Sequence, residues 1–124
     1  MQAKVFLALR LLLGLFMVVL GINKFFGFID LPSPDGDGGE LMRIYATSGF
    51  LKLIGILEFA GGLCLLASKF VPLALTFITA IMFNAAIYHG LHDLPGIGPA
   101  LLSLLLSLAL VYDNKDRFSD LLKA

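Results

Sequence analysis

The stretch LKLIGILEFAGGLCLL, from Leu51 to Leu66, has the composition of a helix in lipid, apart from the carboxylate of Glu58 in its middle. A charged group near the bilayer centre costs at least about 2.5–3.5 kcal/mol, so such residues usually face the interior of a helical bundle and find partners there. The stretch therefore predicts a membrane-spanning helix with a buried polar face.

The composition of the whole chain indicates an integral membrane protein. Of the 124 residues, 59% are hydrophobic and only 15% are charged. A soluble domain of this length would show clear polar faces, because it could not bury so much apolar surface. The nine basic and nine acidic residues balance, so no net charge favours a nucleic acid as partner. Cys64 is the only cysteine, which excludes an internal disulfide.

Four apolar segments come close to the length that crosses a bilayer, which is about 20 mostly apolar residues. They are residues 5–28, 48–67, 70–90 and 96–112. Residues 30–46 are predicted to form a polar outer loop with proline and glycine, and residues 113–124 a mixed-charge cytoplasmic tail. The prediction is an all-α, integral membrane four-helix bundle that forms a single domain, 1–124.

The basic residues of the short loops predict how the bundle is oriented. One side would carry Lys4, Lys69, Lys115, Arg117 and Lys123. The other side would carry Arg43 together with the acidic residues Asp30, Asp35, Asp37, Glu40 and Asp93. Because positive charge marks the cytoplasmic side, both termini are predicted to be cytoplasmic.

Glycine lines the charged faces of the first two predicted helices. Helical periodicity places Arg10, Gly14, Gly21 and Lys24 on one face of the first helix, and Gly55, Glu58 and Gly62 on one face of the second. Glycine lets two helix backbones approach closely in a membrane. We therefore expect these two faces to pack together. Ala100, Ser103 and Ser107 make a similar stripe of small residues in the fourth helix.

The depths of the charged residues predict a contact between Arg10 and Glu58. At a rise of about 1.5 Å per residue, Arg10 lies roughly 8 Å and Glu58 roughly 15 Å from the cytoplasmic ends of their helices. The long arginine side chain would bridge this difference directly or through one water. The pair would either fix the helix register, at a net cost in stability, or take part in ligand or proton chemistry.

Further polar residues are expected near the outer boundary. Asn84 is predicted on the outer side of Glu58, as interhelical glue or as part of a pocket. Lys24 and Lys52 would be either anchors whose ammonium groups reach the interface or the cationic rim of that pocket. His89 is predicted to hydrogen-bond at the interface.

No metal site is predicted. His89 and His92 lie three residues apart, but structural zinc takes four ligands and the chain has no third histidine. The run DGDGGE, residues 35–40, is unlike a calcium-binding loop because Glu40 stands where the turn glycine is required.

In order, the segments LRLLLGLFMVVLGINKFF, ATSGFLKLIGILEFAGGLCLL, FVPLALTFITAIMFNAAIYHGLHD and LLSLLLSLALVYDNKDRFSDLL resemble the DoxX family of small bacterial four-helix membrane proteins. The first-helix pattern of the family carries over as Arg10, Gly14, Gly21 and Lys24. The second carries over as Glu58 followed by Gly61 and Gly62, and Asn84 and His89 match polar positions of the third helix. The resemblance implies a link to respiratory or sulfur-oxidising quinone chemistry and to oxidative-stress complexes.

The sequence is compatible with three functions. The first is an accessory component of a quinone-linked redox system in the bacterial inner membrane, with a pocket for a lipophilic ligand such as a quinone. The pocket candidates are Arg10, Glu58, Asn84, Lys24 and His89. The second is a non-enzymatic scaffold that binds a membrane partner protein. The third is proton-coupled transport, which would require a homo-oligomer because a single four-helix unit has little room for a pore. Redox-cofactor ligands are missing from the sequence, so an autonomous enzyme is not expected.

Overall fold

The computed structural model of the protein describes residues 2–30 and 32–123. Within these ranges the chain forms helices and no strand. The helices are α1 (Gln2–Phe26), α2 (Asp37–Ser48), α3 (Phe50–Ala67), α4 (Val71–His92), η1 (Leu94–Gly96), α5 (Ile97–Asp113), α6 (Lys115–Phe118) and η2 (Ser119–Leu122). Helices α1, α3, α4 and the combined η1–α5 segment are long and apolar enough to cross a membrane. The predicted all-α fold with four spans is therefore confirmed.

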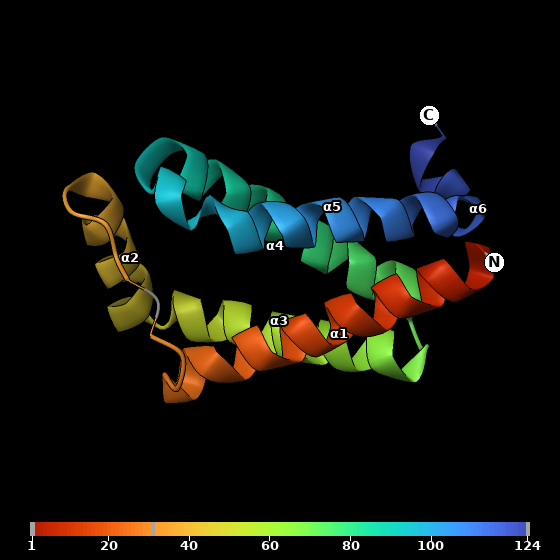
Figure 1. Cartoon of the computed structure of the whole chain (residues 1–124), viewed down its shortest axis with the longest axis horizontal. Coiled ribbons are helices and arrows are strands. Elements are labelled where there is room, and N and C mark those ends of the chain that lie inside the picture. Colours follow the sequence, from red (N-terminus) through yellow and green to blue (C-terminus); the bar gives the residue numbers. More distant parts are fainter. Residues whose placement is uncertain (1, 31, 124) are drawn as a thin grey trace.

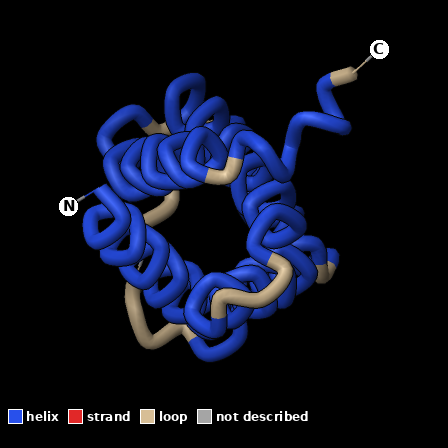
Figure 2. The backbone as a smooth tube through the Cα atoms, turned by 90° about the vertical axis from the view of Figure 1, so that its right-hand side faces the viewer, coloured by secondary structure: helices blue, strands red, loops and turns tan. Residues whose placement is uncertain are grey.

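The four long helices form a ring in which α1 lies next to α3 and α5, and α4 lies next to α3 and α5 (Figure 2). Successive helices run in opposite directions, so both chain termini lie at one end of the bundle, here called the terminal end (Figure 1). Helix α2 lies across the opposite end, here called the α2 end. The short α6 and η2 fold back beside the terminal end.

The prediction of a polar loop over residues 30–46 is wrong for its second half, which belongs to α2. Within α2, Arg43 donates two hydrogen bonds to the carboxylate of Glu40. Its Nε lies 3.1 Å from Oε2, and its Nη2 lies 2.5 Å from Oε1. This neighbouring guanidinium holds the pKa of Glu40 below its ordinary value. Gly49, with a φ of +93°, then turns the chain from α2 into α3, in a conformation that other residues rarely adopt. Because α2 begins with two glycines within its first three residues, composition alone does not indicate this helix.

Glycine makes the contact between α1 and α3 possible. A Cβ atom added to Gly62 would lie 2.7 Å from the carbonyl oxygen of Gly14, and one added to Gly21 would lie 2.6 Å from that of Gly55. These pairs place the glycine-lined faces of the two helices against each other. Gly61 faces α4 instead, where a Cβ would lie 3.0 Å from Ile78 Cδ1.

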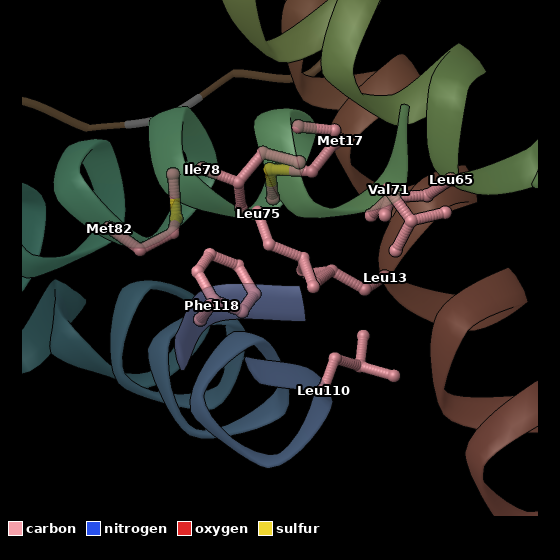
Figure 3. Packing of buried hydrophobic residues seen from close by; sticks show 10 residues of the cluster. Leu13, Met17, Leu65, Val71, Leu75, Ile78, Met82, Leu110 and Phe118 are labelled. Atoms are coloured by element: carbon pink, nitrogen blue, oxygen red, sulfur yellow. The ribbon is translucent and has the colours of Figure 1, made fainter. Parts of the chain in front are cut away.

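The buried apolar side chains concentrate toward the terminal end, where they form one cluster (Figure 3). The cluster consists of Leu13, Met17, Leu65, Val71, Ala74, Leu75, Ile78, Met82, Leu110 and Phe118. Phe118 comes from α6, so its ring fixes the C-terminal segment to the bundle. Beyond Met82, toward the α2 end, Ala100 is the only buried apolar side chain in the part of the chain that the structure describes.

The replacement Gly62→Ala is expected to destabilise the protein by about 1–3 kcal/mol, because the added methyl group would force α1 and α3 apart. Thermal unfolding in detergent, followed by circular dichroism, measures the effect. The matched control is Gly98→Ala in the first turn of α5, where an added Cβ meets nothing within 4 Å. Equal stability of the two variants would contradict the proposed role of the close contact.

Candidate functional site

A buried ion pair joins α1 to α3. The ammonium Nζ of Lys24 lies 2.5 Å from Oε1 of Glu58, and the two side chains are 19% and 1% exposed. The second carboxylate oxygen of Glu58, Oε2, is buried and accepts no hydrogen bond from any of the described residues. The pair therefore combines a cation that has further N–H donors with a carboxylate oxygen that has no protein partner.

The glycine contacts explain why Lys24 reaches Glu58. Because Gly14 lies opposite Gly62 and Gly21 opposite Gly55, residue 24 lies level with residue 52, about 9 Å along the axis from Glu58. Side chains in a helix lean toward its N-terminus. Lys24 therefore leans into the bundle from the α2 end, and Glu58, on an antiparallel helix, leans toward it. Because each side chain leans toward the other, their charged groups meet despite the separation of about 9 Å along the axis.

The predicted contact between Arg10 and Glu58 is wrong. In the same register Arg10 lies level with residue 66, about 12 Å along α3 from Glu58, and it leans toward the terminal end, away from the carboxylate. Its Nη1 instead donates a hydrogen bond to the carbonyl oxygen of Leu65. That carbonyl belongs to the last turn of α3, where a cation complements the helix dipole.

Asn84 is not part of this site. Its position on α4 is about 200° around the helix from Met82, which faces the core. The side chain is exposed and donates to the carbonyl oxygen of Ala80 in its own helix, at 3.4 Å. The expected role of Asn84, as interhelical glue or as part of a pocket beside Glu58, is therefore wrong, because the side chain does not face the bundle interior.

His89 lies near the α2 end and pairs with Asp93. Its Nδ1 is 3.1 Å from Oδ2 of Asp93, and its ring packs edge-on against Tyr88. The hydroxyl of Tyr88 donates to the carbonyl oxygen of Gly38 at 2.9 Å, which ties α4 to α2. In the described part of the chain, no group of three or more His, Cys, Asp or Glu side chains could hold a metal ion.

Asn23 is a buried polar residue that the sequence did not single out. Its Oδ1 accepts from the backbone N–H of Ile29 at 2.7 Å, and its Nδ2 donates to the Ile29 carbonyl oxygen at 3.1 Å. It thereby closes the turn that follows α1 through Gly27, whose φ is +61°. An asparagine shortly before a glycine at the end of an apolar helix is the signal that could have indicated it.

The two described cavities lie away from Glu58. One, of about 290 Å³, is at the terminal end and is lined by Arg10 among others. The other, of about 550 Å³, lies beside the start of α2 and is lined by residues of the segment 33–46. Glu58, which is 1% exposed, lines neither of them.

The sequence model of the DoxX family matches residues 5–91, which include almost all of α1 and α4, the whole of α3 and both members of the ion pair. The chain belongs to the DoxX family. No curated protein and no solved structure matches the chain. With its four apolar helices, this DoxX family member is a multi-pass membrane protein.

In this DoxX chain, Lys24→Met would leave the Glu58 carboxylate buried without its partner, which is expected to cost about 3–5 kcal/mol of stability. Adding Glu58→Gln should recover much of that loss, because no unpaired charge then remains. Unfolding in detergent micelles, followed by circular dichroism, measures both. The matched control is Lys52→Met, which removes an exposed lysine of α3 that lies level with Lys24. Strictly additive losses in the double variant would contradict the coupling.

Proposed function

We propose that the protein is an accessory component of a redox system in the bacterial inner membrane, and that its Lys24–Glu58 pair binds the polar head of a lipophilic ligand of the quinone class. The observation that carries the proposal is the buried Oε2 of Glu58, which has no partner among the described residues. Buried polar atoms are normally hydrogen-bonded, so an orphan carboxylate oxygen is a place for a ligand group.

The chemistry of the pair suits both oxidation states of a quinone. Nζ of Lys24 carries three N–H donors and lies 2.5 Å from one oxygen of Glu58, so a donor that points away from that oxygen would bond a quinone carbonyl oxygen. Oε2 of Glu58 would accept a hydrogen bond from the hydroxyl group of the reduced form. The pair would therefore hold and orient the ring, while electrons would pass to and from the ligand in a partner protein.

The packing around the pair supports a ligand that enters from the α2 end. The interior on that side has little buried apolar packing, whereas the terminal end is filled by the apolar cluster. Lys24 is 19% exposed, and it extends from the α2 end toward Glu58, so the ion pair lies on the α2 side of the apolar cluster. A small-molecule site combines apolar walls with a few convergent polar groups, and Lys24 and Glu58 would supply the polar groups.

A second candidate function is a scaffold that binds a partner membrane protein, with the ion pair serving assembly of the bundle. It is favoured by the near-complete enclosure of Glu58, which is 1% exposed and lines neither of the described cavities. A buried pair of this kind adds little net stability and would serve to specify the helix register.

The two functions separate by native mass spectrometry of protein extracted gently from its membranes. Wild type is expected to retain a small molecule, and Glu58→Gln is expected to retain at least about tenfold less, because a hydrogen bond to a charged group is lost. The matched control is Glu40→Gln, which replaces the only other glutamate, an exposed one. Solvent extraction identifies the retained molecule by its mass. If neither wild type nor control retains one, the scaffold replaces the ligand site.

We further propose that both termini are cytoplasmic. Lys4, Lys69, Lys115, Arg117 and Lys123 belong to the first residues of α1, the α3–α4 turn and the C-terminal segment, which all lie at the terminal end. The α2 end carries Arg43 with most of the acidic residues of the connecting segments. Short cytoplasmic loops are rich in lysine and arginine, which supports this direction.

The lone cysteine makes the orientation testable by labelling. In a Cys64→Ser background, Ser33→Cys is expected to react with a membrane-impermeant maleimide on intact spheroplasts. Ser119→Cys is expected to react only after the membrane is permeabilised, and it serves as the matched control, since both serines are exposed. The reverse pattern would overturn the proposed direction.

A further inference from the structure

The cavity at the terminal end is built from three parts of the chain that are far apart in sequence. Its polar walls come from Arg10 of α1, Ser68 of the α3–α4 turn, and Asp113, Asn114 and Arg117 around the end of α5 and in α6. Its volume of about 290 Å³ is near the lower end of the range for small-molecule sites. It has room for a compact polar group rather than for a whole lipid.

The charges of this cavity favour a singly charged anion. Two arginines, Arg10 and Arg117, and one aspartate, Asp113, line the cavity, which leaves a net charge of +1. Within the described residues, none of these three groups forms a salt bridge. Arg10 uses Nη1 on the Leu65 carbonyl oxygen, so its other N–H groups are available. Planar guanidinium groups bind phosphate oxygens through paired hydrogen bonds.

The position of the cavity in the bundle matches the level of lipid head groups. It lies where α1 and α4 begin and where α5 ends, which is the boundary of the spanning segments. Phe6 and Leu7 of α1 and Val71 of α4 add apolar wall beside the charged groups. Leu7 is 47% exposed on the side of α1 that would meet acyl chains. Basic pockets between spanning helices at this level suit anionic head groups.

The packing of α6 holds Arg117 at the cavity. Phe118 is 8% exposed and belongs to the buried apolar cluster, so it anchors the short helix against the bundle (Figure 3). Arg117, its neighbour in sequence, is thereby held over the cavity rather than free in a tail. Lys115 lies in the same helix but has its ammonium group over the ring of Tyr112, 4.6 Å from the ring centroid, and does not line the cavity.

From these observations we infer that the terminal-end cavity binds an anionic phosphate group through Arg10 and Arg117, with the phosphodiester of an anionic phospholipid or free phosphate as its source. This site is independent of the function proposed for Glu58, since it lies at the other side of the apolar cluster. It would attach the bundle to a specific lipid, or to phosphate, at the membrane surface that holds both termini.

Native mass spectrometry of the purified full-length protein in detergent tests the site. The protein is titrated with dioleoylphosphatidylglycerol and with dioleoylphosphatidylcholine, which has the same acyl chains and no net charge. Wild type is expected to bind the anionic lipid at least about tenfold more tightly, and Arg117→Gln to lose about tenfold of that affinity. Asp113→Asn should raise the affinity, because it removes the opposing charge. The control Lys115→Gln removes one charge from the same helix and should stay within about twofold of wild type.

The outcomes separate the sources and decide the proposal. If inorganic phosphate displaces the anionic lipid from wild type, free phosphate is the ligand, and if it does not, the lipid head group is; either result supports the site. Arg10→Gln should weaken binding as Arg117→Gln does, but Arg117→Gln decides because Arg10 also bonds to Leu65. Equal binding of the two lipids, or equal losses in Arg117→Gln and Lys115→Gln, would overturn the inference.

Discussion

The close contact between α1 and α3 through four glycines determines where the polar groups of this protein meet. Gly14 lies against Gly62 and Gly21 against Gly55, at separations that leave no room for a Cβ atom. In a membrane, lipid is as apolar as the helices, so close packing of backbones rather than hydrophobicity drives association. The two contacts determine the register of α1 against α3 along their whole length. This register determines the position along the bundle of every charged side chain on these faces.

The Lys24–Glu58 pair is a direct consequence of that register. Its charges lie in a region where each would be costly alone, and their attraction does little more than offset the loss of water. Such a pair therefore adds little net stability, and its presence is better explained by a role in ligand binding or in specifying the helix register. The unpartnered Oε2 of Glu58 points to a ligand group, whereas the enclosure of the carboxylate points to helix specification.

The apolar packing and the buried ion pair lie in different parts of the bundle. The apolar cluster fills the terminal half and also anchors α6 through Phe118. This arrangement separates the Lys24–Glu58 pair from Arg10, which instead caps the last turn of α3 and lines a cationic cavity. The chain thus carries two charged regions of different character, one inside the membrane and one at its surface.

The sequence by itself determined the spanning helices, because a bilayer demands about 20 apolar residues per helix, and the glycine faces, because helical periodicity groups them. Only the tertiary structure decided the partner of Glu58, since Lys24 and Arg10 lie on the same face and differ only in register and in the direction in which each side chain leans. It also decided the outward position of Asn84. The polar residues of helix α4 do not gather on one face, so its sequence holds no polar stripe that could indicate its rotation, and its contacts with α3 and α5 determine which face turns inward.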